Sequence, residues 1–206
     1  RLPEEMETVI MQNHSLALEY VYKVIRKSYP PYESSWVSEL KHLQKTIDPR
    51  QYENDEGLSP IYLHIAKALH YAVDVKKGPF KEAEPYILNQ DSFSSHYIVD
   101  ALKKAMPEKE DVIAECRVSA FQYAKDILKG PFPKGEKTIG SHFPDMAYEY
   151  AKDILCGAFK KGEMAIASDK TLAFNYAKEI IKKPFPQGEE QIAKDPYLAY
   201  EYASTI

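Results

Sequence analysis

The stretch AFQYAKDILKGPFPKGE at residues 120–136 decides the fold, because close copies of it recur along the chain. Its first nine residues return as AYEYAKDIL at 147–155 and as AFNYAKEII at 173–181, and AYEYA follows at 199–203. The copies begin 27, 26 and 26 residues apart. A fixed period of this length indicates a repeat protein, in which every repeat packs against its neighbours.

Weaker copies lie upstream in the same register, and they centre on Tyr20, Tyr71 and Tyr97. The segment YPPYE at 29–33 follows Tyr20 at the offset at which FPKGE follows Tyr123. The spacing from Tyr20 to Tyr71 is 51 residues, close to twice the period. We therefore expect that one copy is missing between them.

Each repeat predicts two helices separated by a proline break. In the copy at 120–128, apolar residues fall at positions i, i+3, i+4, i+7 and i+8, which is one face of a helix. Gly130 and Pro131 then end this helix, and we expect Phe132 to fold back as a core plug. Gly135 and Glu136 open a second, short helix, with the glycine as its cap and the carboxylate in its first turn.

Helices this short are marginal in water, and stacking one repeat on the next buries their apolar stripes. The sequence therefore predicts an all-α fold, an α-solenoid of tandem helix–proline break–short helix repeats. We expect the repeat array to cover residues 60–206. Residues 1–59 are expected to form an N-terminal helical cap with a degenerate repeat, and the polar stretch at 48–57 a loop.

Composition excludes several classes of protein. The net charge of −4 argues against a generally basic nucleic-acid binder. There is no apolar run of about 18 residues, so we expect no membrane span, and no signal peptide opens the chain. The 2 cysteines do not form a disulfide framework, which favours a cytoplasmic protein.

Signals for catalysis and for metals are weak. The chain has no Cys-x-x-Cys, no His-Glu-x-x-His and no glycine-rich phosphate loop, and its 6 histidines form no i, i+4 pair. The sequence therefore predicts no enzyme, no metal and no cofactor.

Two side-chain types recur in every repeat and have both a structural and a functional interpretation. Glutamates stand in the expected first turns of the short helices, at Glu33, Glu84, Glu110, Glu136, Glu163 and Glu189. They complement the helix dipole, or they bind a basic partner or cations. Tyrosines recur on the apolar stripe, where core packing explains them better than base stacking. Tyr148 and Tyr200 are at outer positions, where we expect partial exposure.

Lysines gather where each first helix ends and in the loop that follows. The candidate basic edge consists of Lys76, Lys77, Lys103, Lys104, Lys129, Lys134, Lys160, Lys161, Lys182 and Lys183. Stacked in register, they could attract phosphates or an acidic protein surface. The structural alternative is that cations favour helix C-termini and that a solvated face carries charge.

The segment YAKDILKGPFPKGE at 123–136 resembles short helical repeats in uncharacterised proteins of large tailed phages and related viruses. The resemblance covers about residues 65–206 and the looser copy at 17–36. It implies an α-helical array and a viral source, and it brings no catalytic residues. The period differs from those of tetratricopeptide, ankyrin and armadillo repeats, so their ligand rules do not transfer.

Three functional hypotheses remain. The first is a non-enzymatic scaffold that binds a protein, with a host or defence protein as the target in the host cytoplasm if the source is viral. The second is nucleic-acid or nucleotide binding along the lysine edge, with an affinity that falls steeply with salt. The third is an assembly component that stacks end to end; the sequence leaves the oligomeric state open.

Overall fold

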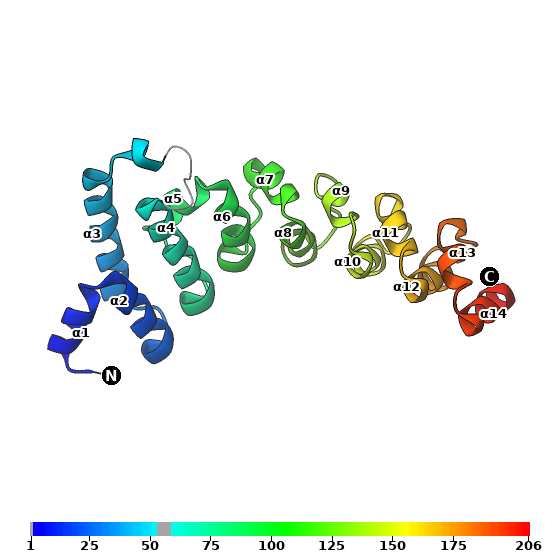
Figure 1. The fold of residues 1–206 in the computed structure, drawn as a ribbon, viewed down its shortest axis with the longest axis horizontal. Helices are drawn as coiled ribbons and strands as arrows, with labels where there is room; N and C mark the ends of the chain where they lie inside the picture. The colour runs from blue at the N-terminus through cyan, green and yellow to red at the C-terminus, as the bar shows by residue number, and fades with distance from the viewer. Residues whose placement is uncertain (1, 53–58) are drawn as a thin grey trace. The chain divides into compact units, whose positions relative to one another are not determined.

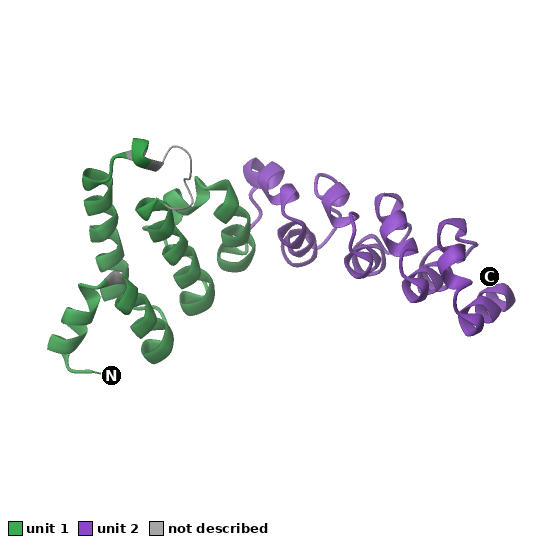
Figure 2. Cartoon of the chain, in the orientation of Figure 1, with its two compact units in different colours: residues 1–103 green, residues 104–206 purple. Residues whose placement is uncertain are grey.

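The computed structural model describes residues 2–52 and 59–206, and within these ranges it contains helices and no strand. The chain divides into two compact units, unit 1 at residues 1–103 and unit 2 at residues 104–206 (Figure 2). Of the predicted loop at 48–57, the part from Pro49 to Tyr52 forms the short 3-10 helix η2, and residues 53–57 lie outside the described ranges. The predicted boundary between residues 59 and 60 stays a prediction.

In unit 1 the two longest helices, α3 and α4 with its continuation η4, follow each other along the chain (Figure 1). The described elements of unit 1, besides η2, are α1 (Glu4–Met11), α2 (His14–Tyr20), η1 (Val21–Ile25), α3 (Pro30–Thr46), α4 (Pro60–His70), η4 (Tyr71–Lys76), α5 (Glu84–Leu88), α6 (Asp91–His96) and η5 (Tyr97–Leu102).

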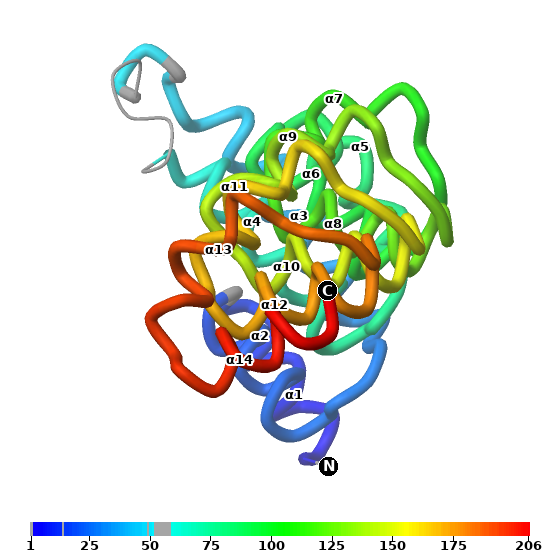
Figure 3. Tube along the Cα trace, turned by 90° about the vertical axis from the view of Figure 1, so that its right-hand side faces the viewer, coloured from blue at the N-terminus to red at the C-terminus, as the bar shows by residue number. Residues whose placement is uncertain are grey.

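In unit 2 the helices lie in two rows, with α7, α9, α11 and α13 in one row and α8, α10, α12 and α14 in the other (Figure 1). Seen end-on, α9, α11 and α13 are each offset from the one before in the same sense (Figure 3). The elements of unit 2 are η6 (Pro107–Lys109), α7 (Glu110–Glu115), α8 (Arg117–Gln122), η7 (Tyr123–Leu128), α9 (Glu136–Ile139), α10 (Pro144–Glu149), η8 (Tyr150–Leu155), η9 (Lys160–Gly162), α11 (Glu163–Ala167), α12 (Lys170–Asn175), η10 (Tyr176–Ile181), α13 (Pro186–Ile192) and α14 (Pro196–Thr205).

The sequence predicts an α-helix for the first half of each repeat, but the helix found there is α-helical only in its first part. It begins as an α-helix and continues from the recurring tyrosine as a π-helix, as α8 does into η7. The π-helix then ends in a residue with left-handed backbone. In this repeat the N–H groups of Lys129 and Gly130 both donate to the carbonyl of Ala124, which closes the widened turn.

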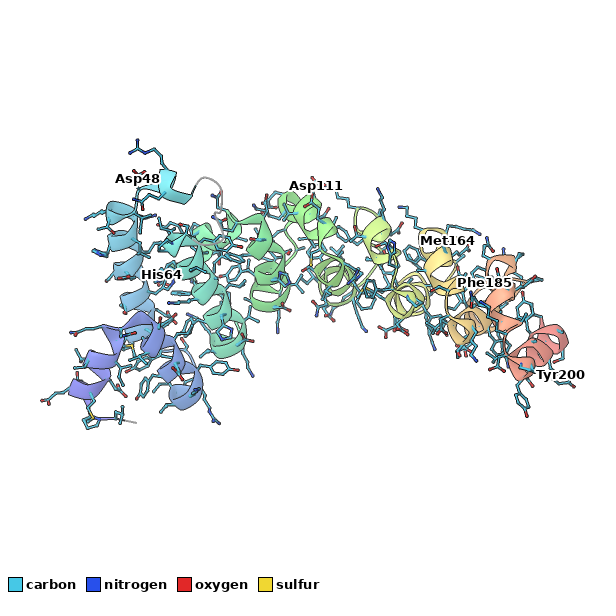
Figure 4. All side chains as sticks on the ribbon, viewed as in Figure 1. Asp48, His64, Asp111, Met164, Phe185 and Tyr200 are labelled. Atoms are coloured by element: carbon cyan, nitrogen blue, oxygen red, sulfur yellow. The ribbon has the colours of Figure 1, made fainter. Side chains whose placement is uncertain are left out.

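The recurring aromatic residues form the core, which confirms the structural interpretation of both. The tyrosines that open the π-helices are fully buried at Tyr71, Tyr97, Tyr123, Tyr150 and Tyr176. The plug phenylalanines are buried at Phe80, Phe132, Phe159 and Phe185, and Figure 4 shows the last of these. Tyrosine and phenylalanine of one repeat pack together, with ring centroids 5.1 Å apart for Tyr123 and Phe132.

The two outer tyrosines differ from each other. Tyr200 is 73% exposed and points away from α14, as expected (Figure 4). The expectation for Tyr148 is wrong, because only 8% of this residue is exposed. Its hydroxyl donates to Glu179 Oε2 of the next repeat at 3.0 Å, so the neighbouring repeat covers it.

The buried tyrosines also link each repeat to the one before, through a contact we call the tyrosine bridge. The Phe159 N–H donates to the Tyr176 hydroxyl oxygen at 2.8 Å, and that hydroxyl donates to Glu163 Oε1 at 3.2 Å. The break after the first helix leaves the phenylalanine N–H without a helical partner, and the tyrosine of the following repeat supplies one. Equivalent N–H bonds join Phe80 to Tyr97 (2.9 Å), Met106 to Tyr123 (3.0 Å), Phe132 to Tyr150 (2.8 Å) and Phe185 to Tyr202 (2.6 Å).

The bridge explains the recurring glutamates. They lie in first helical turns, as predicted, and they also accept tyrosine hydroxyls from the next repeat, as Glu189 does from Tyr202 at 2.9 Å. Their recurrence is therefore accounted for by contacts within the fold.

The bridge also shows that no copy is missing between Tyr20 and Tyr71. The Tyr71 hydroxyl accepts from the Tyr29 N–H at 2.8 Å and donates to Glu33 at 2.7 Å, so these two repeats are direct neighbours. The additional residues of this interval include those that lengthen α3 to 17 residues and α4 to 11. The period alone could not distinguish an insertion from a lost repeat.

The two lengthened helices are fastened to each other inside unit 1 at His64 (Figure 4). Trp36 Nε1 donates to the carbonyl of His64 at 3.0 Å, and His64 Nε2 lies 2.9 Å from the carbonyl oxygen of Trp36. Their rings stack with centroids 4.8 Å apart and an interplanar angle of 7°. This buried histidine therefore has a packing role.

The glycines before the glutamates have a role that the sequence did not predict. Gly135 and Gly162 are the N-caps of their short helices, as expected, whereas Gly188 lies inside α13. A Cβ at Gly162 would lie 2.6 Å from Phe159 Cε1 and 3.0 Å from Ala147 Cβ. In this repeat the plug ring therefore occupies the space that a side chain at residue 162 would take. In an earlier repeat Ala83 stands at this position and is fully buried.

The substitution Gly162→Ala should lower the free energy of unfolding by about 1–3 kcal/mol, because the new methyl group overpacks the plug. The matched control is Gly157→Ala, where a Cβ would meet only the Leu155 carbonyl oxygen, at 3.7 Å. Urea unfolding followed by circular dichroism measures both variants. Equal stabilities for the two variants would contradict the packing role.

The substitution Tyr176→Phe should cost about 1–3 kcal/mol, because it leaves the buried Phe159 N–H without its acceptor and removes one hydrogen bond to the buried Glu163 carboxylate. Burial, aided by the charge of Glu163 and opposed by the Phe159 N–H bond, raises the pKa of Tyr176 from 10.0 to about 12. The unfolded chain releases this proton first, so the contribution is complete below about pH 10 and is lost as the pH rises towards about 12.

Wild-type protein should therefore lose more stability between about pH 9 and 11 than Tyr176→Phe does, in urea unfolding at each pH. Tyr200→Phe is the control, because that ring is exposed, and it should behave as wild type. A Tyr176→Phe variant as stable as wild type at neutral pH would refute the bridge.

Candidate functional site

The ends of the π-helices carry a recurring feature that no single copy of the repeat reveals. Each π-helix stops at a residue other than glycine with left-handed backbone, with φ between 50° and 54°. These residues, which we call the cap residues, are Arg26, Lys77, Lys103, Lys129, Cys156 and Lys182. All six are exposed.

The cap residues hold this conformation at a cost. Left-handed backbone costs a residue with a Cβ about 1–2 kcal/mol, and helices that end this way favour glycine there. Glycine follows the cap residue in three repeats, at Gly78, Gly130 and Gly157, and none of these three glycines has positive φ. Five of the six caps are instead basic, in a position where stability alone would select glycine.

The structure separates the ten candidate lysines into two sets. The first set is ion-paired to the short helices: Lys76 to Glu33 (2.8 Å), Lys134 to Asp111 (3.0 Å), Lys160 to Glu163 (3.1 Å) and Lys161 to Glu136 (2.9 Å). Three of these pairs involve glutamates that belong to the tyrosine bridges. The lysines of these three pairs therefore offset largely buried carboxylates, which supports their structural interpretation, whereas Asp111, the partner of Lys134, is exposed.

The pKa of Glu33 shows the effect of this pairing. Burial alone raises it, but hydrogen bonds from Lys76, Tyr71 and Ser28 outweigh burial, and the pKa lies below its ordinary value. The pairing acts on the lysine in the Lys134–Asp111 pair, where Asp111 raises the pKa of Lys134 by accepting its hydrogen bond.

The second set is exposed, and its side chains make no ion pair or hydrogen bond with the residues that the structure describes. It consists of Lys77, Lys103, Lys104, Lys129, Lys182 and Lys183, that is, four cap residues and two of their neighbours in sequence. Their charges are therefore available to a partner. We call this set the free lysines.

Within unit 2, Lys129, Cys156 and Lys182 end η7, η8 and η10, which follow the helices of one row (Figure 1). Packed helices lie about 8–10 Å apart, so cap residues of successive repeats are offset by about this distance. The free lysines of unit 2 thus form a spaced series of positive charges.

The surface beside this series is mixed in charge. Lysines two residues after the recurring tyrosine pair with the next repeat: Lys125 with Glu149 (3.8 Å), Lys152 with Glu179 (3.4 Å) and Lys178 with Glu201 (3.8 Å). Asp126 and Asp153 are exposed in the same turns. These three lysines are not among the ten candidates from the sequence, and their partners come from the following repeat.

Unit 2 also exposes large apolar side chains. Met164 is 75% exposed, and Phe143 is exposed with the Arg117 guanidinium 3.3 Å from its ring centroid. The sequence reasoning missed Met164, although aligning the repeats gives a signal. The residue that follows the recurring glutamate is charged in other copies, as at Lys137 and Glu190.

Two further observations concern metal binding and membrane insertion. In residues 2–52 and 59–206 there is no group of three or more His, Cys, Asp or Glu side chains that could hold a metal ion. Over the same described ranges, every helix is too short or too polar to cross a membrane.

The substitution Lys129→Gly should raise the free energy of unfolding by up to about 1 kcal/mol, because glycine adopts left-handed backbone without strain. Lys125→Gly, inside η7, should lower it by about 1 kcal/mol, because glycine is a poor helix former. Thermal and urea unfolding measure both. If Lys129→Gly destabilises as much as Lys125→Gly, the cap lysine is there for stability.

The chain was compared with protein-family models, with curated proteins and with solved structures, and none of the three gave a match. The interpretation of the free lysines therefore depends on their own geometry. The similarity to viral helical repeats stays a prediction from the sequence.

Proposed function

We propose that the chain is a non-enzymatic interaction scaffold, an α-solenoid with an N-terminal helical cap, that binds a protein partner through its free lysines. One observation carries the proposal: basic, unpaired side chains recur at helix ends where the backbone favours glycine. A repeat array that presents one side chain per repeat suits an extended partner surface.

The partner's complementary surface is acidic, since the free lysines have no counter-charge among the described residues. Two observations favour a protein over a nucleic acid. Exposed Asp126 and Asp153 interrupt the positive series, and exposed Met164 and Phe143 offer apolar contacts typical of protein interfaces.

Nucleic acid is the second candidate, and the specific observation in its favour is the doubling of charge at two helix ends, Lys103–Lys104 and Lys182–Lys183. A phosphate backbone gives an affinity that falls steeply with salt.

A viral source, a host or defence protein as the target and a cytoplasmic location rest on the sequence resemblance and composition alone. They define where to look for the partner: in lysate of cells that contain the protein naturally.

Replacing the free lysines of unit 2 by glutamine, in Lys104→Gln, Lys129→Gln, Lys182→Gln and Lys183→Gln combined, should weaken binding of the purified partner about tenfold or more. The partner is first identified by affinity capture from that lysate, and its affinity is then measured by isothermal titration calorimetry. The stability of this variant should stay near that of wild type.

The control removes the same charge at ion-paired positions, with Lys125→Gln, Lys152→Gln, Lys170→Gln and Lys178→Gln combined. Exposed ion pairs contribute little stability, so this variant should fold and bind the partner within about threefold of wild type. Equal weakening by both variants would refute a role for the free lysines. Salt-sensitive binding of single-stranded or duplex probes in fluorescence anisotropy, lost only in the first variant, would instead establish the second candidate.

A further inference from the structure

A hollow of about 380 Å³ lies in unit 1 where two neighbouring π-helices end. The helices η1 and η4 pack against each other there, and the lining residues are Tyr22, Lys23, Arg26, Asp74, Val75 and Lys77. Two of these, Arg26 and Lys77, are cap residues of successive repeats. Two cap residues from neighbouring repeats therefore line one hollow.

Both cap residues are held in position by their backbone. Arg26 has φ 54° and Lys77 φ 51°, and their N–H groups donate to the carbonyls of Val21 and Ala72. The cations therefore stand beside the cavity on a rigid support.

The charges of the hollow do not cancel. Lys23 pairs with Glu19 at 2.5 Å, and Asp74 accepts from His70 Nδ1 at the same distance. Arg26 Nε donates to the carbonyl of Lys23 at 3.0 Å, which orients the guanidinium and leaves its two terminal nitrogens for a ligand. Arg26 and Lys77 are the lining cations without a carboxylate partner among the described residues.

An aromatic ring completes the lining. Tyr22 is 47% exposed, and its ring stacks on His70 with centroids 5.4 Å apart. In unit 2 the equivalent position is occupied by the paired lysines Lys125, Lys152 and Lys178. The next two repeats carry Val73 and Val99 at this position, so among these six copies Tyr22 is the aromatic residue, and it lies beside two unpaired cations.

We propose that this hollow binds a nucleoside monophosphate. The phosphate lies between the guanidinium of Arg26 and the ammonium of Lys77, since a guanidinium can bind two phosphate oxygens at once. The base lies on the free face of Tyr22, because aromatic rings stack on every base. The Asp74 carboxylate also lines the hollow and is paired with His70. A cavity of about 380 Å³ is within the range of small-ligand sites, about 300–1,000 Å³.

This proposal does not depend on the scaffold proposal, whose test uses residues of unit 2. The test is isothermal titration calorimetry of the full chain with AMP, ribose 5-phosphate and inorganic phosphate at low salt. AMP should bind, and Arg26→Gln with Lys77→Gln should weaken it at least tenfold. The matched control, Lys129→Gln with Lys182→Gln, neutralises two cap residues in unit 2 and should bind AMP within twofold of wild type.

The aromatic part has its own variant, Tyr22→Leu, which keeps an apolar side chain at an exposed position. It should weaken AMP severalfold and leave ribose 5-phosphate unchanged. Thermal melting shows that each variant is folded. The proposal is overturned if AMP does not bind at millimolar concentration, if the control loses as much affinity as the Arg26 and Lys77 pair, or if AMP binds no better than ribose 5-phosphate.

Discussion

The structure depends on a hydroxyl group at the junction of successive repeats. A break in the chain's helical structure ends each first helix and leaves an N–H group without a helical partner, and burying such a donor without a partner is costly. The hydroxyl of the tyrosine in the following repeat accepts a hydrogen bond from this N–H and donates one to the carboxylate of the short helix after the break, as Tyr176 does with Phe159 and Glu163. A phenylalanine at this position could pack, but it could not join the two repeats by hydrogen bonds.

The same contact accounts for much of the charge pattern. A carboxylate drawn into the core needs counter-charge, and a lysine from the loop or from the next repeat supplies it, as Lys161 does for Glu136 at 2.9 Å. Lysines that serve this purpose are structural. Those that remain without a partner stand at the left-handed helix ends or directly after them, where the helix dipole favours a cation but the backbone favours glycine, and this contrast directs attention to binding.

The amino-acid sequence predicts the helical repeats and the buried tyrosines and plugs, because apolar periodicity reports which face of a helix is buried. It does not predict the π-helical turns, since the same stripe fits both helix types. It also does not show that Lys129 rather than Gly130 adopts left-handed backbone, because glycine is the expected residue there. The candidate lysines could not be sorted from sequence, because their acidic partners lie up to one repeat away, and Tyr148 is buried by a residue of the next repeat.

The bridge constrains the chain unevenly along each repeat. From the recurring tyrosine to the residue whose N–H bonds the next tyrosine is always nine residues, and from there to the glutamate always four, in the copies that start at Tyr20, Tyr71, Tyr97, Tyr123, Tyr150 and Tyr176. From that glutamate to the next bridging tyrosine the count is 13 or 14 residues, but 38 between Glu33 and Tyr71. Each repeat therefore has a segment of fixed length, from the tyrosine to the glutamate, which carries the cap residue. The segment from the glutamate to the next tyrosine varies in length, and evolution or a protein engineer can lengthen it without separating neighbouring repeats.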